Sequence, residues 1–76
     1  MMEMRLPKLG AGVDKGIIVA WLKSQGQAVR KGEPLMQIET DKAIGEVESP
    51  FDGVVIKLVR PQGSEVSVGE LIAIIQ

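Results

Sequence analysis

The chain consists of two halves that repeat each other. A shift of 37 positions takes Gly16 to Gly53 and Gly26 to Gly63 without a gap. Other identical or conservative pairs keep the same shift: Gln25 with Gln62, Val29 with Val66, Gly32-Glu33 with Gly69-Glu70, Ile17 with Val54, Val19 with Ile56, Lys23 with Arg60, and Leu35 with Ile72. A repeat of this kind predicts two similar units packed about a pseudo-twofold axis. Lys42 lies on the connection between the halves, which the repeat does not explain.

The length and composition favour a small domain made of strands. With 76 residues there is room for one domain, 1–76, with halves of approximately 1–40 and 43–76. A domain of this size buries only about 60% of the surface that its unfolded chain exposes. The chain is 45% hydrophobic but has one Phe, one Trp and no Tyr, so its core must be built mainly from Val, Ile, Leu and Met. Such β-branched enrichment favours strands.

Several classes of function are disfavoured by what the chain lacks. Without cysteine or histidine, it has no disulfide, no thiol nucleophile and none of the commonest general bases. A net charge of −1 with mixed signs predicts no nucleic-acid partner. No apolar run approaches the roughly 18 residues that span a bilayer, and Glu3 and Arg5 interrupt any signal-peptide pattern. We therefore expect a soluble, intracellular chain with no membrane partner and little catalytic equipment.

Glycine and proline divide the chain into segments of strand length. No helix is expected between these breaks. The predicted fold is all-β, a flattened barrel or sandwich of eight short strands at residues 3–7, 16–22, 28–29, 35–39, 44–48, 54–59, 65–66 and 71–75. The glycines at 26, 32, 63 and 69 are interpreted as turn residues with positive φ, and Trp21 as a packing residue.

The strands on either side of Lys42 are predicted to form one hairpin. Apolar and polar residues alternate in 35–39 and 44–48, which predicts one solvent-exposed face and one buried face for each strand. The pseudo-twofold axis would carry the Lys42 turn onto the gap between the two chain ends. The termini should then lie together, at the end opposite Lys42. Segments 17–22 and 54–59 are apolar on both faces, so the sequence leaves their inward-facing residues open.

The run Glu39-Thr40-Asp41-Lys42-Ala43 between two matching halves resembles the attachment motif of lipoyl domains. These are the swinging-arm modules of the acyltransferase component in 2-oxo acid dehydrogenase complexes. Further landmarks of that family are found along nearly the whole chain: Leu6-Pro7-Lys8-Leu9-Gly10, Gly16 with Trp21, Gly26, Val29 and Gly32, and Ser49-Pro50 before Gly53. The resemblance implies two four-stranded antiparallel sheets with pseudo-twofold symmetry and an attachment lysine, Lys42, on a hairpin turn.

The resemblance also implies a cofactor, lipoate, in amide linkage to Lys42, with Asp41 and Ala43 as flanking recognition residues. An external enzyme that acylates a lysine needs a protruding amine on a fixed backbone. Side chains of Thr40 and Asp41 are expected to bond nearby backbone amides and stiffen the turn, and the small Ala43 leaves one flank of the lysine open. The remaining lysines are interpreted as surface charge: Lys8, Lys15, Lys23, Lys31 and Lys57.

Partner recognition is predicted in a second element beside the lysine. In the family, the loop before the second strand helps the decarboxylase to recognise its domain, which points here to Ala11, Gly12, Val13, Asp14 and Lys15, with Glu39 and Thr40 from the hairpin. That loop often contains Glu in the family but not in this chain. Pyruvate, branched-chain 2-oxo acid, 2-oxoglutarate and acetoin systems therefore all remain open.

Acidic residues are also expected near the lysine end. They could attract positively charged partner surfaces, although a solvated strand face explains them equally well: Glu39, Asp41, Glu46, Glu48 and Asp52.

The resemblance implies a carrier and not an enzyme. Its partners would be a lipoylating enzyme, a thiamine-dependent decarboxylase, an acyltransferase catalytic domain in a separate part of the parent protein, and a flavin-dependent dihydrolipoamide dehydrogenase. The expected location is the cytoplasm of a bacterium or archaeon, or the mitochondrial matrix.

Two alternatives to the lipoyl carrier stay open. A biotinyl carrier domain shares the duplicated halves and central lysine, but methionines flank its lysine. In an unmodified interaction barrel, Lys42 beside Asp41 would be a solvated charge pair worth about 0 to 1 kcal/mol.

Overall fold

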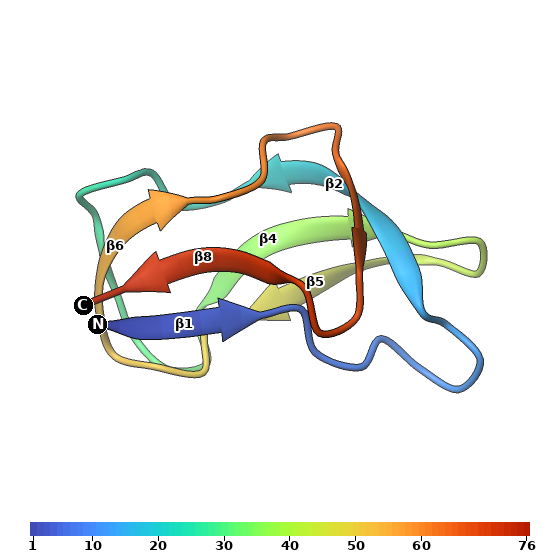
Figure 1. Cartoon of the computed structure of the whole chain (residues 1–76), viewed down its shortest axis with the longest axis horizontal. Helices are drawn as coiled ribbons and strands as arrows, with labels where there is room; N and C mark the ends of the chain where they lie inside the picture. The colour runs from blue at the N-terminus through green and yellow to red at the C-terminus, as the bar shows by residue number, and fades with distance from the viewer.

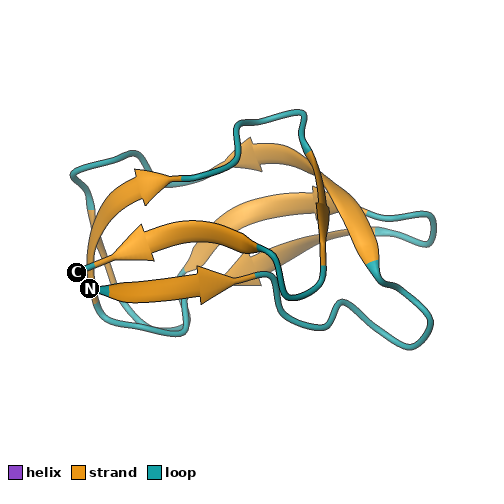
Figure 2. Cartoon of the chain, viewed as in Figure 1, coloured by secondary structure: helices purple, strands orange, loops and turns teal.

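The chain forms eight strands and no helix in a computed structural model that describes residues 1–76 (Figure 1, Figure 2). No helix long and apolar enough to cross a membrane is found. The predicted strands are all found, with ends shifted by at most two residues. They are β1 (Met2–Arg5), β2 (Lys15–Trp21), β3 (Ala28–Val29), β4 (Pro34–Glu39), β5 (Ile44–Glu48), β6 (Gly53–Leu58), β7 (Glu65–Ser67) and β8 (Leu71–Ile75).

The strands form two four-stranded antiparallel sheets that pack as a flattened sandwich. Their orders are β1-β8-β6-β3 and β5-β4-β2-β7. Each strand has a counterpart at the same place in the other sheet: β1 corresponds to β5, β8 to β4, β6 to β2 and β3 to β7. The sandwich is not a closed barrel, so of the two predicted forms the sandwich is the one observed.

Matched hydrogen bonds show that the two halves of the sequence build the same structure. The amide of Gly26 donates to the carbonyl of Val55, and the amide of Gly63 donates to the carbonyl of Ile18, both at 2.7 Å. These two bonds exchange partners under the 37-residue shift, because 26 and 18 become 63 and 55. Each half thus holds the other through equivalent main-chain contacts. The predicted pseudo-twofold relation is confirmed at the level of single bonds.

The structure decides the register that the sequence left open. Ile18 in β2 and Val55 in β6 are buried, whereas Ile17 and Val54 point outward and are 42% and 37% exposed. The core between the sheets contains thirteen buried apolar side chains from all eight strands and from the residue after β1: Met4, Leu6, Ile18, Val29, Leu35, Met36, Ile38, Val47, Val55, Val66, Ile72, Ala73 and Ile75. Burial of this aliphatic cluster is the main stabilising contribution to the fold.

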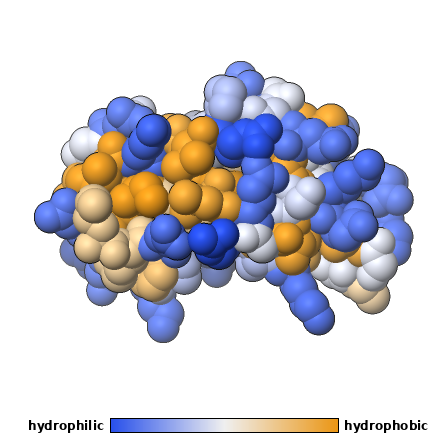
Figure 3. Space-filling view, in the orientation of Figure 1, coloured by the Kyte–Doolittle hydropathy of each residue, from blue (hydrophilic) through white to orange (hydrophobic).

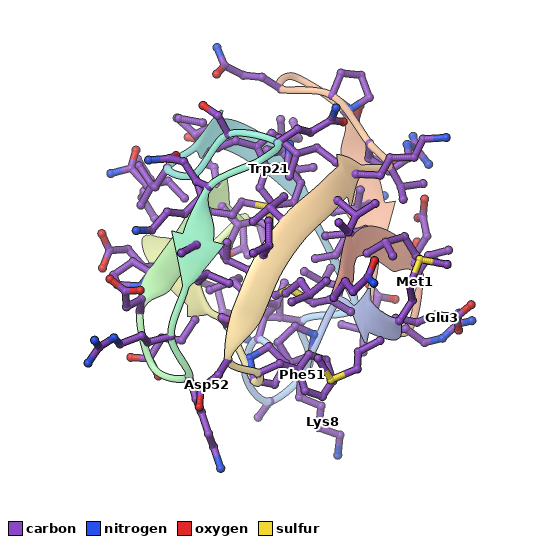
Figure 4. The ribbon with its side chains drawn as sticks, turned by 90° about the vertical axis from the view of Figure 1, so that its left-hand side faces the viewer. Met1, Glu3, Lys8, Trp21, Phe51 and Asp52 are labelled. Atoms are coloured by element: carbon purple, nitrogen blue, oxygen red, sulfur yellow. The ribbon has the colours of Figure 1, made fainter.

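Trp21 is a packing residue, as predicted. Its ring lies partly buried against the core, where Figure 4 labels it, and its indole N–H donates to the carbonyl of Arg60 at 2.8 Å.

A carboxylate braces each of the turns that precede β4 and β8. Glu33 accepts from the Arg30 amide at 2.6 Å, and Glu70 accepts from the Ser67 amide at 3.0 Å. The Arg30 bond, helped by the nearby Lys23 ammonium, holds the pKa of the Glu33 carboxyl below its ordinary value.

Gly26 and Gly63 share the backbone conformation that the repeat predicts. Both have φ of +90°, as do the other matched pair, Gly32 and Gly69. Gly26 is the third residue of a turn closed by the bond from the Gln27 amide to the Ser24 carbonyl at 3.1 Å. A positive φ at this turn position disfavours residues that have a Cβ. The interpretation of these glycines as turn residues is confirmed.

Replacement of either turn glycine by valine should destabilise the domain. We expect Gly26→Val and Gly63→Val each to lower the free energy of unfolding by about 1 to 2 kcal/mol or more, since a β-branched residue is strained at φ +90°. Urea denaturation followed by tryptophan fluorescence measures the change. Gly45→Val is the matched control, because an added Cβ there meets nothing within 4 Å and φ is not positive. Equal losses in all three variants would contradict the explanation.

The two chain ends lie together at one end of the molecule. Met2 pairs with Ile75 in the antiparallel ladder of β1 and β8. In Figure 1 the N- and C-termini meet at the left, and the turn between β4 and β5 extends to the right along the 31 Å long axis. The termini therefore lie opposite Lys42, as the repeat predicts.

Candidate functional site

Lys42 lies at the tip of the hairpin formed by β4 and β5. Glu39 and Ile44 form the last strand pair before the turn, so residues 40–43 make the connection. The Thr40 amide donates to the Ala43 carbonyl at 2.9 Å and closes it. Residues Asp41, Lys42 and Ala43 are all exposed. The hairpin thus presents one primary amine on a short, closed turn.

The Thr40 hydroxyl fixes the backbone on both sides of the lysine amide. Its oxygen accepts from the amides of Lys42 and Ala43, at 3.2 Å each, and the hydroxyl donates to the Ala43 carbonyl at 3.1 Å. The expected stiffening by Thr40 is confirmed. The same expectation was wrong for Asp41, whose carboxylate makes no hydrogen bond to the turn. Thr40 already takes both amides that follow Asp41, so the aspartate side chain is left in solvent.

The loop between β1 and β2 reaches the lysine side chain. Lys42 Nζ donates to the carbonyl of Ala11 at 3.0 Å. The next residue, Gly12, has φ of +73°, and a Cβ there would lie 3.6 Å from Nζ. No carboxylate lies within ion-pair distance of Lys42, so a single neutral acceptor holds the ammonium. Sequence reasoning missed this contact because it joins residues 31 positions apart through a main-chain carbonyl.

A hollow of about 320 Å³ lies between the same loop and the hairpin turn. Six of the seven residues predicted for partner recognition line it: Gly12, Val13, Asp14, Lys15, Glu39 and Thr40. The seventh, Ala11, supplies the carbonyl that accepts from Lys42. The structure therefore brings the two predicted elements into one region around the lysine.

The predicted acidic residues are spread along the molecule. Glu46 pairs with Gln37 and Glu48 with Pro34, so both lie farther from the Lys42 turn than Glu39 does. Glu39 and Asp41 line the hollow, and so does Glu65 of β7, which sequence reasoning missed because only the strand order places β7 beside β2. Lys15 Nζ lies 4.0 Å from the Glu65 carboxylate. The expectation for Asp52 was wrong. Its carboxylate accepts from the Lys31 amide at 2.8 Å, and it precedes β6 at the termini end, which faces the viewer in Figure 4.

Relatives identify the family. The family model described as "Biotin-requiring enzyme", Biotin_lipoyl, matches residues 2–75. The chain belongs to the biotinyl/lipoyl family. Within it, the solution structure of the lipoyl domain of the 2-oxoglutarate dehydrogenase complex from Azotobacter vinelandii superimposes with a TM-score of 0.76 and 32% sequence identity, covering 100% of this chain and 96% of that one. The chain is thus a lipoyl domain in fold and family.

Relatives of this lipoyl domain are acyltransferase components. The dihydrolipoyllysine-residue acetyltransferase component of the pyruvate dehydrogenase complex from Zymomonas mobilis is 41% identical over 73 residues, which are 95% of this chain. The dihydrolipoyllysine-residue succinyltransferase component of the 2-oxoglutarate dehydrogenase complex from Staphylococcus saprophyticus is 40% identical over 75 residues, 99% of this chain. The chain spans only 17% and 18% of the length of these two relatives. Similar identity to both leaves the 2-oxo acid unassigned.

Proposed function

We propose that Lys42 carries lipoate in amide linkage, and that the domain 1–76 shuttles acyl groups and reducing equivalents between the active sites of a 2-oxo acid or acetoin dehydrogenase complex. The observation that carries the proposal is the exposed Lys42 amine, held on a closed turn without an ion-pair partner. Asp41 and Ala43 flank it in the positions that the family uses for recognition by the lipoylating enzyme.

The residues around Lys42 fit an amide-linked group. Nζ has one hydrogen-bond acceptor, the Ala11 carbonyl, and an amide nitrogen keeps one N–H that could serve the same acceptor. Acylation also removes the lysine charge, and no carboxylate is left unpaired by that change. When bound, lipoate supplies the dithiolane that undergoes reductive acylation and acyl transfer. The chain has neither cysteine nor histidine for this chemistry. Its own contribution is therefore the attachment point, Lys42.

The position of the lysine suits a tethered carrier. Both termini lie at one end of the 31 Å axis and Lys42 at the other, so a linker at the termini leaves the attachment turn free to enter successive active sites. The partners in this proposal are the lipoylating enzyme, a thiamine-dependent decarboxylase, an acyltransferase catalytic domain elsewhere in the parent protein, and dihydrolipoamide dehydrogenase. They work together in the bacterial or archaeal cytoplasm or in the mitochondrial matrix.

Intact mass of the protein purified from its own host tests the proposal. We expect the mass of the lipoylated chain, with the added mass on the peptide that contains Lys42. Biotin is the competing group, since the family description names it, but Asp41 and Ala43 stand where biotinyl domains have methionines. A biotinyl mass, or an unmodified chain in a host that lipoylates its other carrier domains, would contradict the proposal.

Attachment and decarboxylase recognition should depend on different residues. We expect the double variant Ala11→Glu, Lys15→Glu to be lipoylated at nearly the wild-type rate, because the Ala11 contact with Lys42 uses a main-chain carbonyl. Its rate of reductive acylation should change by at least about threefold, because the loop goes from a neutral balance of Asp14 and Lys15 to three acidic residues on a surface that steers the partner. The free energy of unfolding should change by less than about 1 kcal/mol, since the Lys15–Glu65 pair is exposed and solvent screens both its loss and the repulsion between the two carboxylates that replace it.

This prediction is measured with free domain in excess over the decarboxylase. Lys57→Glu, on the opposite sheet, is the control because it makes the same charge change as Lys15→Glu at another exposed lysine. An unchanged acylation rate in the double variant, or a collapse of its lipoylation, would show that the loop does not have the proposed role.

A further inference from the structure

Strand pairing places two acids and two isoleucines in one row beside the Lys42 turn. Glu65 of β7 pairs with Ile17 of β2, Ile17 pairs with Glu39 of β4, and Glu39 pairs with Ile44 of β5. Gly16, Ile18, Ile38 and Val66, which are chain neighbours of Ile17, Glu39 and Glu65, are buried, so these three side chains point away from the core. Ile44 lies three positions before the buried Val47 in β5, and its side chain therefore points away from the core as well. We call these four residues the lysine-end row. Ile44 is 64% exposed and Ile17 is 42% exposed.

The opposite sheet contains an equivalent row at the termini end. Ala28 pairs with Val54, and Val54 exchanges two main-chain hydrogen bonds with Gln76, at 2.7 and 2.9 Å. Met1 lies beyond Met2 in β1 and completes the row beside Gln76. Under the pseudo-twofold relation these residues correspond to Glu65, Ile17, Glu39 and Ile44 in that order. We call this the termini-end row.

Comparison of the two rows separates what the fold needs from what it does not. Two of the four positions are apolar in both rows: Ile17 is equivalent to Val54, and Ile44 is equivalent to Met1. The other two positions are neutral in the termini-end row, Ala28 and Gln76, but acidic in the lysine-end row. One fold accepts both sets, so the acids are not a requirement of the sandwich.

The strands of the two sheets differ in the same way. Glu39, Glu46, Glu48 and Glu65 lie on β4, β5 and β7, whereas Glu3 is the one acid on the strands of the other sheet. Figure 3 shows a large apolar area over β6 and β8, toward the termini, and a mainly hydrophilic surface toward the Lys42 end. Val54 and Ile56, both in β6, are among the exposed large hydrophobic residues of the chain. Acid is thus concentrated on the sheet that carries the attachment lysine.

The lysine-end row is continuous with the hollow beside Lys42. Ile17, Glu39 and Glu65 belong to both. Glu39 is in no ion pair within the chain, and Glu65 has only the 4.0 Å contact with Lys15. A carboxylate between two exposed isoleucines matches a protein surface that presents an apolar contact flanked by arginine or lysine side chains.

We propose that the lysine-end row is the docking surface for the 2-oxo acid decarboxylase, with Ile17 and Ile44 as its apolar contacts and Glu39 and Glu65 as its charge contacts. The inference rests on the proposed function and deepens it. It adds a sheet face to the loop of residues 11–15 as a determinant of partner choice. The proposal requires a matching basic and apolar surface on the decarboxylase.

The two rows supply the test and its control. Ile17→Ser and Ile44→Ser are compared with Val54→Ser, which makes a similar change at the position equivalent to Ile17. Each domain is lipoylated with the host's lipoylating enzyme, checked by intact mass, and assayed for reductive acylation by the host's decarboxylases for pyruvate, 2-oxoglutarate and branched-chain 2-oxo acids. We expect KM with the cognate enzyme to rise about tenfold for Ile17→Ser and Ile44→Ser with kcat nearly unchanged, and Val54→Ser to stay within about twofold.

A binding experiment without the cofactor gives an independent readout. The unlipoylated, ¹⁵N-labelled domain is titrated with the same decarboxylase. We expect amide signals of the lysine-end row to broaden and those of Ala28, Val54 and Gln76 to stay sharp. Glu39→Gln should weaken this binding and reduce its salt dependence, whereas Glu3→Gln on the opposite sheet should change neither.

The outcomes separate the docking surface from the carrier function. Equal effects of Val54→Ser and Ile17→Ser, unchanged KM in both isoleucine variants, or broadening confined to the termini-end row would overturn the docking surface. If thermal denaturation shows that Ile17→Ser is already unfolded at the assay temperature, the result for Ile44→Ser decides, because Ile44 is the more exposed of the two residues, at 64% against 42%. Absence of lipoylation or acylation in the wild-type domain would instead refute the proposed function. In that case, absence of binding by the unlipoylated domain would also overturn the docking surface.

Discussion

Lys42→Arg should contain no lipoyl group after co-expression with the host's lipoylating enzyme, whereas the wild-type domain should be fully modified. A guanidinium remains protonated at any working pH and does not form the amide. It can still donate to the Ala11 carbonyl, so the turn should keep its conformation. The free energy of unfolding should therefore stay within about 0.5 kcal/mol of the wild-type value. Intact mass and urea denaturation measure the two quantities.

The control for this variant is Lys57→Arg. Lys57 is exposed in β6 of the other sheet, so its replacement tests whether any surface lysine affects the ligase. We expect that variant to be fully lipoylated. Retention of lipoate on Lys42→Arg would assign attachment to another lysine and remove the basis of the proposed function.

Leu35→Ala and Ile72→Ala should each lower the free energy of unfolding by about 2 to 5 kcal/mol, the usual cost of a large-to-small change in a packed core. Both side chains have 0% exposure, and they are equivalent under the repeat. A small domain has a total stability of only about 5 kcal/mol or somewhat more. Either variant should then have a substantial unfolded fraction at physiological temperature. Urea denaturation and thermal unfolding give the values.

Val19→Ala is the matched control for the core variants. Val19 is on β2 but is 37% exposed, so its truncation should cost less than about 1 kcal/mol. Losses below that value in both core variants would mean that the sheets repack around the missing atoms. Unequal losses would measure how far packing in the two halves departs from the symmetry of their main chains.

The strands could be predicted from the sequence because their limits are local. Gly and Pro mark the breaks, and alternation identifies the Lys42 hairpin, so 44–48 and 71–75 match the observed strands at both ends. The inward-facing residues of β2 could not be predicted. Ile17 and Ile18 are both large and apolar, and only pairing with β4 and β7 decides which of them is buried. That information lies in contacts between distant segments.

The site was predictable where its signal is carried by side chains of adjacent residues. Lys42 and Thr40, whose hydroxyl holds the turn, are neighbours in the run 39–43. The repeat draws attention to this run because it lies on the connection between the two halves. The Ala11 carbonyl has no side-chain signal, and Glu65 approaches only through strand order. Asp52 was misplaced because sequence proximity was taken as spatial proximity. After the turn, β5 carries the chain away at about 3.3 Å per residue, so Asp52 reaches the other end.

The adjacent chain ends have a further consequence for topology. On one sheet, four residues join Glu39 to Ile44, and on the other sheet the equivalent positions, Gln76 and Met1, lie beside each other with no such connection between them. A copy of Thr-Asp-Lys-Ala inserted between Gln76 and Met1 would close the backbone into a ring with twofold symmetric strand order. In such a ring the start of the chain is arbitrary, and circular permutants opened at the β2–β3 or β6–β7 turn would be related by the symmetry. The ring would display one attachment lysine at each end.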